Sequence, residues 1–385
     1  MDLSLLLSNV LHGVWYYVVI FLVIITVVVF VHELGHFLIA RANGVKVEVF
    51  SIGFGPEVWG RTTSAGTRWR IALIPLGGYV KFYGDADAAS ATQSDQPMSD
   101  EEKSWSFQHK RVGQRAAIVV AGPAANFVFA ILGLAGLFMV LGQPVTEPVI
   151  GGIYPGTAAE EVGLKTGDRI LAINGRSVDR FQDIQRVVRL EIERPLEMTI
   201  KRGDETFTIQ AQPRIDTRKG LFGDLEKVPV LGVSADPAST RIIHHGPVSA
   251  LGESLAETGS MIRSTFVGIG QMISGTRNSD ELGGPIRIAK GAGEAAQLGI
   301  SSVIYYTILL SLNLGLINLF PIPVLDGGHL LFYAFEAILG RPLGEKAQEF
   351  GFRIGLFLVL ALMVFATRND IVALPVWDAV VRMFS

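Results

Sequence analysis

The sequence predicts a polytopic α-helical membrane protein with four transmembrane helices, an inserted α+β domain and a small membrane-associated β element. Of its 385 residues, 49% are hydrophobic and 18% are charged, whereas a soluble domain usually carries about a quarter charged residues. Residues 14–31 contain no charge at all. Because ~20 apolar residues in a helix cross a hydrocarbon core of roughly 30 Å, such a run predicts a membrane span.

The composition also excludes several classes of function. The formal net charge is −3 and no basic block is present, so nucleic acid is not an expected partner. The chain contains no Cys, which excludes thiolate metal ligands, disulfides and a Cys nucleophile. The first apolar run is interpreted as a retained span, because no Lys or Arg precedes it and no small-residue cleavage site follows it.

The alternation of apolar and polar stretches predicts the order of segments along the chain. The expected segments are a first transmembrane helix in 1–45, a polar loop in 46–112, a second span in 113–142, a small α+β domain in 143–213, a helical or linker region in 214–300, a third transmembrane segment in 301–327, a polar link in 328–350, and a fourth span with the tail in 351–385.

Two of these segments carry local signals for β structure. In the first loop, residues 71–82 are apolar, Gly-bearing, β-prone and too short for a spanning helix, which predicts either a core strand or a re-entrant segment. In the α+β domain, Asn174-Gly175 predicts a hairpin turn, residues 181–190 a helix, and residues 195–201 and 205–211 two strands. The acidic residues in 85–103 are typical of a solvated loop.

The distribution of basic residues predicts the orientation in the membrane. The N-terminal segment has no Lys or Arg, whereas the first loop and the 328–350 link with its flanks carry many. Short cytoplasmic loops are enriched in basic residues. We therefore expect the N-terminus and the 143–300 insert outside the cytoplasm, and the first loop and the link inside it.

The motif His32-Glu33-Leu34-Gly35-His36 at the end of the first span predicts a metal site. On a helix, His32 and His36 are four residues apart and share a face, so both can bind one ion. Glu33 lies beside the first ligand, where it can act as a general base on water. Ionisable groups inside a span are costly and predict function.

A zinc site of this kind needs a third protein ligand, and Asp326 is the best candidate. It follows an apolar run broken by Pro321 and Pro323, where an unpartnered carboxylate would be expensive. His329 is an alternative third ligand. His109, His244 and His245 are expected in polar segments without a metal.

Three motifs together resemble the site-2 protease family of intramembrane zinc metalloproteases. They are HELGH in the first span, AGPAANF at 121–127 in the second, and NLFPIPVLDGG at 318–328 in the third. The stretch PGTAAEEVGLKTGDRILAING at 155–175 is similar to a bacterial PDZ domain. The combination resembles the bacterial RseP group of regulated intramembrane proteases, although one PDZ pattern is found here and the better-known member has two.

The resemblance implies further roles for named residues. Asn318 resembles the family's Asn that holds the substrate backbone near the zinc, with simple helix–helix hydrogen bonding as the alternative. Asn126 is expected either to hydrogen-bond between helices or to act in catalysis. Phe54 lies in a second Gly-flanked loop near the site. The re-entrant element implied to bind substrate comprises Gly77, Gly78, Tyr79, Val80 and Lys81, with plain packing of this strand as the alternative.

The expected function is therefore a zinc-dependent intramembrane endopeptidase with one Zn²⁺ per chain, located in the bacterial inner membrane with its PDZ domain in the periplasm. Its expected partners are the lipid bilayer and a single-pass membrane substrate, such as an anti-sigma factor or a signal-peptide remnant. A non-catalytic membrane adaptor that binds protein tails through the PDZ domain is the main alternative. A transporter with broken helices would require inverted repeats, which the sequence does not contain.

Overall fold

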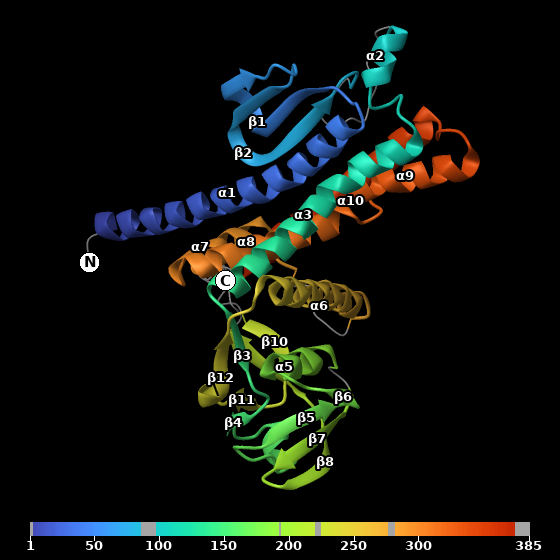
Figure 1. Cartoon of the computed structure of the whole chain (residues 1–385). Coiled ribbons are helices and arrows are strands. Elements are labelled where there is room, and N and C mark those ends of the chain that lie inside the picture. Colours follow the sequence, from blue (N-terminus) through green and yellow to red (C-terminus); the bar gives the residue numbers. More distant parts are fainter. Residues whose placement is uncertain (1–2, 86–97, 192–193, 220–224, 276–281, 374–385) are drawn as a thin grey trace. The chain divides into compact units, whose positions relative to one another are not determined.

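The computed structural model describes residues 3–85, 98–191, 194–219, 225–275 and 282–373. The chain forms two compact units, one comprising residues 1–133 with 283–385 and the other residues 134–282 (Figure 1). The first unit is thus built from both ends of the chain, and the second is an insertion into it.

The first unit is mainly helical. Its helices are α1 (Leu3–Ala42), α2 (Asp100–Trp105), α3 (Val112–Val140, which continues into the second unit), α7 (Pro285–Gln297), α8 (Ile300–Asn318), α9 (Asp326–Leu339) and α10 (Glu345–Val372). Within the described residues, four helices are long and apolar enough to cross a membrane, namely Trp15–Ala42, Val112–Val140, Ile300–Asn318 and Lys346–Val372. These match the four predicted spans.

A small β-sheet follows α1 directly. Strands β1 (Val47–Thr62) and β2 (Arg68–Phe82) both bend, so that each contributes two segments. Residues 47–52 pair with 78–82 on one side and with 68–71 on the other, and residues 68–72 also pair with 57–62. The segment 78–82 is therefore at one edge of the sheet, and in the described part of the chain no strand pairs with its outer side.

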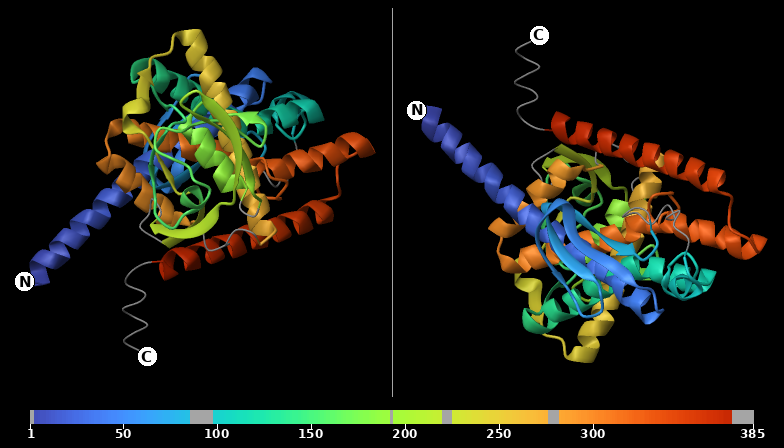
Figure 2. Two further views of the ribbon diagram at one scale, coloured as in Figure 1. Left: turned by 90° about the horizontal axis from the view of Figure 1, so that it is seen from below. Right: turned by 90° about the horizontal axis from the view of Figure 1, so that it is seen from above.

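The sheet packs along the C-terminal half of α1, as the view from above in Figure 2 shows. Aromatic rings form this contact: Phe50 stacks on Trp69 with ring centroids 4.2 Å apart, and Phe37 of α1 lies edge-on to both. Val47, Phe50 and Ala40 are fully buried in the same cluster. This apolar contact fixes the sheet beside the HELGH turn of α1.

A carboxylate attaches α7 to the C-terminal end of α10. Oδ1 of Asp370 accepts the N–H of Gly284, at 2.9 Å, and Oδ2 accepts the N–H groups of Ile286 and Arg287, both at 3.0 Å. These are donors that the first turn of a helix cannot satisfy internally. Asp370 is buried, so the contact ties these two helices together near α1.

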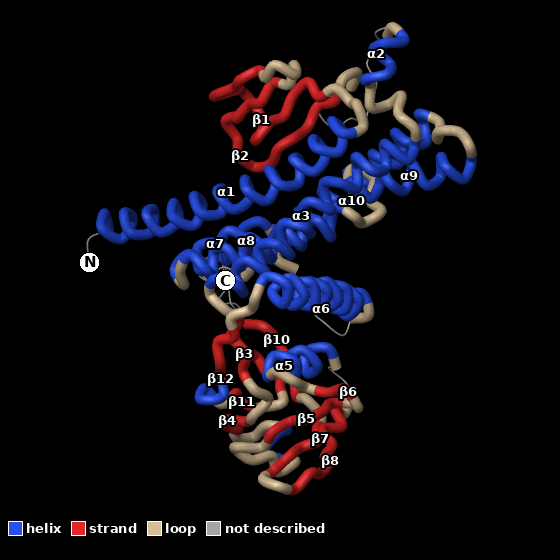
Figure 3. Tube along the Cα trace, in the orientation of Figure 1, coloured by secondary structure: helices blue, strands red, loops and turns tan. Residues whose placement is uncertain are grey.

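The second unit contains a small α+β fold and one long helix. Its elements are β3 (Gln143–Thr146), β4 (Ile150–Ile153), α4 (Ala158–Glu161), β5 (Arg169–Ile173), β6 (Arg176–Ser177), α5 (Phe181–Leu190), β7 (Leu196–Arg202), β8 (Glu205–Ala211), β9 (Arg214–Lys219), β10 (Leu225–Val230), β11 (Val233–Ala235), a 3₁₀ turn (Pro237–Ser239), β12 (Thr240–Ile243) and α6 (Pro247–Ile273). Figure 3 distinguishes its strands from its helices.

The main sheet of this unit has the strand order β6-β5-β7-β8. Its inner face and α5 enclose a core that includes Ile170, Ile173, Ile184, Met198 and Ile200, each at most 1% exposed. Asn174 and Gly175 both have positive φ, at 50° and 73°, as the two-residue turn between β5 and β6 requires. The predicted turn, the helix at 181–190 and the strands near 195–201 and 205–211 are confirmed at this level.

Three predictions about segments are wrong. The region 214–300 begins with strands rather than helical linker: β11 pairs with β4 and β12 pairs with β3, so this stretch completes sheets that start before residue 155. The polar link 328–350 is largely the helix α9, because the apolar side chains after Gly328 give it a packing face. The third transmembrane helix ends at Asn318, before the two prolines that cannot continue it.

The first loop also differs from expectation. The β element extends back to Val47, and Phe54 lies within β1 rather than in a loop, because alternating apolar residues continue the strand through Gly53 and Gly55. Residues 100–105 form α2, capped by Ser99 and Glu102. The rest of the predicted acidic loop, residues 86–97, and the predicted amphipathic tail from residue 374 onward lie outside the described residues.

Candidate metal centre

Two histidines on successive turns of α1 begin the site. The Nε2 atoms of His32 and His36 lie 3.2 Å apart, and the two rings are nearly perpendicular. His32 is 7% exposed. Because helical residues four apart share a face, α1 alone brings both ring nitrogens to one point.

The third group comes from the far end of the chain. Oδ2 of Asp326 lies 3.1 Å from Nε2 of His32 and 3.5 Å from Nε2 of His36. Asp326 is the first residue of α9, directly after a turn in which Val324 has a φ of 97°. A β-branched residue rarely adopts this conformation, and such strain is concentrated at functional sites.

Two glycines allow the turn before α9 to close tightly. A Cβ atom at Gly327 would overlap the carbonyl groups of Leu319 and Phe320, and one at Gly328 would meet Cα of Pro323 at 2.5 Å. The backbone therefore folds back over the start of α9, which carries the carboxylate to the histidines. This close approach explains the two glycines of the LDGG sequence.

The three side chains fit a single zinc ion. Ligand atoms about 2.0–2.1 Å from a tetrahedral zinc are separated from one another by about 3.3 Å, and the separations here are 3.1, 3.2 and 3.5 Å. Among the described residues, Oδ2 of Asp326 is buried without a hydrogen bond of good geometry. Two imidazoles and a carboxylate form a donor set typical of catalytic zinc, with a fourth position left for substrate.

Helix α3 supports both histidines from one side. Nδ1 of His36 lies 2.9 Å from the carbonyl oxygen of Ile118, and Nδ1 of His32 lies 3.2 Å from the side-chain nitrogen of Asn126. Gly122 lies between them against the rings, where a Cβ atom would meet Cε1 of His32 at 2.9 Å. Both contacts orient the rings, and the Ile118 carbonyl, as an acceptor of the Nδ1–H, leaves Nε2 of His36 for a metal.

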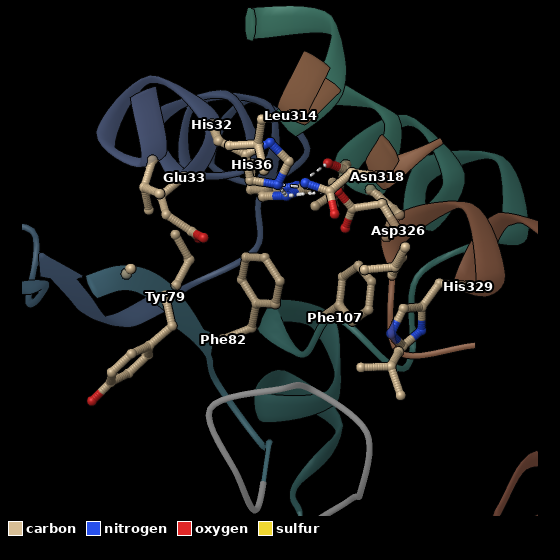
Figure 4. A pocket seen from close by; sticks show the side chains of 18 of the residues that line it. His32, Glu33, His36, Tyr79, Phe82, Phe107, Leu314, Asn318, Asp326 and His329 are labelled. Atoms are coloured by element: carbon tan, nitrogen blue, oxygen red, sulfur yellow. Dashed lines mark hydrogen bonds and ion pairs between the residues drawn. The ribbon is translucent and has the colours of Figure 1, made fainter. Parts of the chain in front are cut away.

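The three groups open into a cavity of about 430 Å³. Figure 4 shows Glu33 on the side of the histidines that faces Tyr79, with Asn318 beside Asp326. Glu33 is close to the sheet, because a Cβ atom at Gly78 would meet its Cγ at 3.3 Å. The remaining lining is largely apolar and comprises Val29, Phe54, Gly77, Val80, Phe82, Phe107, Ile118, Val119, Leu314, Val324, Leu325, His329 and Tyr333.

The structure places most of the predicted site residues in this cavity. Glu33, Asn318 and residues 77–80 line it. Lys81 does not, because its ammonium group pairs with Glu48 at 3.1 Å on the sheet. His329 lines the cavity but packs against the rings of Tyr333 and Phe352, at 6.5 and 5.3 Å, outside the group that can share an ion.

The sequence did not reveal three features of the site. The Ile118 carbonyl carries no side-chain signal. The close approach at Gly122 was signalled only by a Gly-Pro pair in an apolar span. The role of Asn126 was left open between a helix contact and a catalytic role, and the structure places its amide next to the ring of His32.

A comparison with protein families assigns the chain. The model of the family described as "Peptidase family M50" matches residues 20–362. The chain belongs to peptidase family M50. The sequence-based resemblance to the site-2 proteases is thereby confirmed, and with it the prediction of a metallopeptidase.

Relatives along the whole chain agree with this assignment to family M50. "Putative zinc metalloprotease Atu1380" of Agrobacterium fabrum is 46% identical over 93% of this chain and 96% of its own length. "Metalloprotease MmpA" of Caulobacter vibrioides is 38% identical over 94% of this chain and 97% of its own length.

Among solved structures, the PDZ domain of the SdrC-like protein from Listeria monocytogenes is 18% identical, with a TM-score of 0.19 over 23% of this chain and 84% of that chain.

Proposed function

We propose that this M50 peptidase is a zinc-dependent endopeptidase that cleaves single-span membrane proteins within or near their spans. The observation that carries the proposal is the convergence of His32, His36 and Asp326 next to Glu33, in a cavity formed by helices apolar enough to span a membrane. A hydrolytic site between membrane-spanning helices suits a substrate that is itself a membrane helix.

Five polar residues of the cavity have roles in the proposed peptide hydrolysis. His32, His36 and Asp326 would hold the zinc ion, which would supply Lewis acidity toward the scissile carbonyl and toward water. Glu33 accepts the proton of the attacking water and returns it to the leaving amine. The amide of Asn318 donates a hydrogen bond to a substrate carbonyl and fixes the position of the substrate backbone.

The edge strand 78–82 is proposed to hold the substrate. A helix hides its peptide bonds, so a membrane-spanning substrate must unwind before hydrolysis. Residues 78–80 and Phe82 line the cavity, and in the described part of the chain no strand pairs with the outer side of this segment, which suits the addition of an extended substrate segment. The substrate would therefore bind as an added strand between this edge and the metal.

The sheet is proposed to insert into the membrane. Its tips expose large apolar side chains, among them Val58 at 66% and Leu73 at 64%, and an exposed apolar patch of this kind is typical of a lipid-facing surface. The basic residues of the first loop support the proposal that this loop lies at the cytoplasmic side of the bacterial inner membrane and the inserted unit on the periplasmic side. There the 143–243 domain, with its PDZ-like sequence pattern, would filter or bind substrates such as an anti-sigma factor or a signal-peptide remnant.

The test compares Glu33→Gln with the wild type and with Glu57→Gln. Glu57 pairs with Arg68 on the far part of the sheet and serves as the matched carboxylate control. Purified full-length chains are assayed for bound zinc by elemental analysis and for cleavage of single-span substrates after reconstitution, with and without a chelator. We expect Glu33→Gln to keep zinc and lose cleavage, and Glu57→Gln to keep both.

Two outcomes would overturn the proposal. Cleavage by Glu33→Gln at a rate near that of the wild type would show that Glu33 is not the general base. A wild-type chain that neither binds zinc nor cuts any span would favour the non-catalytic adaptor, in which the inserted domain binds protein tails and the metal centre is degenerate.

A further inference from the structure

Asn126 is a fully buried polar residue beside the metal centre, and only the nitrogen of its side-chain amide has a hydrogen-bond partner among the described residues. It is 0% exposed, and its Nδ2 lies 3.2 Å from Nδ1 of His32. Among the described residues, its Oδ1 is buried without any hydrogen-bond partner. Leaving a buried amide oxygen unpaired costs about 1–3 kcal/mol, so another arrangement of this amide has to be considered.

The two orientations of the amide have opposite consequences for His32. With Nδ2 toward the ring, Nδ1 must accept a hydrogen bond, and the proton of a neutral imidazole then resides on Nε2, where it blocks metal binding. A half-turn of the amide places Oδ1 toward the ring instead. Oδ1 then accepts the Nδ1–H of His32, and Nε2 keeps a lone pair that faces Asp326 and His36.

We propose that Asn126 is a positioning residue of the metal centre, whose amide oxygen accepts the Nδ1–H of His32 and holds the tautomer that binds the metal through Nε2. The proposal rests on the proposed zinc-dependent function. The half-turn pairs Oδ1 and moves Nδ2 to the position that Oδ1 occupied, so it is favoured by the tautomer that metal binding through Nε2 requires. It also matches the arrangement at His36, whose Nδ1 lies 2.9 Å from the carbonyl oxygen of Ile118. Both ligands on α1 are then oriented by acceptors on α3.

Helix α8 packs against the main chain and the Cβ atom of Asn126. Oγ of Ser311 on α8 donates to its main-chain oxygen at 3.3 Å. Gly315 of α8 faces it so closely that a Cβ atom there would meet Cβ of Asn126 at 3.1 Å. With α8 on one side and His32 on the other, the side chain has little freedom beyond the half-turn of its amide.

The test measures metal binding rather than turnover. Full-length wild type, Asn126→Leu, Asn126→Asp and Ser311→Ala are purified in detergent, and their zinc affinities are determined by competition with a chromophoric chelator. Leu has nearly the shape of Asn but cannot accept a hydrogen bond, whereas Asp can accept the Nδ1–H. Ser311→Ala removes a neighbouring buried hydrogen bond without touching the ring and is the matched control. Thermal unfolding of the metal-free chains reports on folding.

We expect Asn126→Leu to lower zinc affinity by about 10–100-fold, the usual effect of removing a partner behind a metal-bound histidine. Asn126→Asp should restore affinity to within a few-fold of the wild type, and Ser311→Ala should leave it unchanged. The visible absorption of bound Co²⁺ should shift in Asn126→Leu and return in Asn126→Asp. If Leu does not yield folded protein, Asn126→Ala takes its place in the comparison.

Unchanged zinc affinity in Asn126→Leu would overturn the proposal, and so would an Asp variant as weak as the Leu variant, because shape or burial would then explain the residue. Failure of the underlying function is recognised separately: in that case the wild type itself would not bind zinc, and His32→Ala would make no difference.

Discussion

Gly122 of α3 lies directly against the imidazole of His36, so that a methyl group at this position would overlap the ring. The absence of a side chain lets α3 approach α1 closely enough for the Ile118 carbonyl and the Asn126 amide to reach the two histidines. Gly122 therefore contributes to the metal centre without offering any group to the metal.

Replacing Gly122 by Ala should weaken zinc binding. Overpacking a filled site costs about 1–3 kcal/mol, which corresponds to a loss of affinity of about 5-fold or more. The measurement is chelator competition on the purified chain. Gly113→Ala on the same helix is the control, since nothing lies within 4 Å of a Cβ atom there; equal affinities of the two variants would contradict the prediction.

Asp326 and His329 can be separated as candidates for the third ligand. Asp326→Ala should abolish stoichiometric zinc binding, because it removes the one carboxylate that lies beside both histidines in the described structure. His329→Ala should retain zinc, because its ring packs on Tyr333 and Phe352 instead. Elemental analysis of both variants decides the question, and loss of zinc in His329→Ala alone would reverse the assignment.

Gly77→Ala should impair cleavage while zinc remains bound. Gly77 has a φ of 138°, and a Cβ atom there would overlap the ring of Phe54. The strain of about 1–3 kcal/mol should displace the edge strand that lines the cavity, and kcat/KM should fall by about tenfold or more.

The control for this substitution is Gly66→Ala, at the turn between β1 and β2. Gly66 also has a positive φ, of 83°, but lies away from the cavity lining. Comparable losses of cleavage in both variants would mean that general destabilisation of the sheet, and not the position of its edge, controls activity.

In the inserted domain, the buried carboxylate of Asp168 should make stability depend on acid pH. Its two oxygens accept hydrogen bonds of 2.7 Å from Arg202 and one of 2.8 Å from the N–H of Lys165. Burial raises the pKa of this carboxyl, but the Arg202 and Lys165 hydrogen bonds outweigh burial and hold the pKa below its usual range. The stabilisation is therefore complete above the unfolded value of about 3.9 and is lost as the pH falls through the lower folded pKa.

Asp168→Asn tests this dependence. At pH 7 the variant should be destabilised by about 1–3 kcal/mol, seen as faster hydrogen exchange across β5 and β7 in the full-length chain. Below about pH 4 the difference from the wild type should shrink. Asp204→Asn, at the exposed turn between β7 and β8, should change neither value; a difference for Asp168→Asn that is independent of pH would contradict the assigned ion pair.

The parts of the fold that the sequence predicted are those encoded by local pattern. Residues 14–31 have no charge to interrupt a span, and His32 and His36 are fixed on one helical face by their spacing alone. Asn174-Gly175 determines its own turn. Asp326 could be predicted as a partner of the histidines because a lone carboxylate beside an apolar run requires compensation.

The remaining features depend on contacts that no local pattern encodes. Strand β12 is recognised by its pairing with β3, across the whole inserted fold. Strand β1 passes through Gly53 and Gly55, which read as loop residues until the partner strand is known. The segment after Gly328 forms the helix α9 because its apolar side chains find a packing surface. Its polar residues alone had predicted a loop. The contact between Asn126 and the ring of His32 can be recognised only when α1 and α3 are known to be side by side.

The division of the first unit between the two ends of the chain has a consequence for biosynthesis. His32 and His36 leave the ribosome first, and Asp326 follows only after the entire second unit has been made. If the proposed function holds, a nascent chain carries only two of the three proposed metal ligands and lacks the complete site while it is inserted. Activity would then begin only when α8 and α9 have joined α1, and the order of translation would itself guard against premature proteolysis.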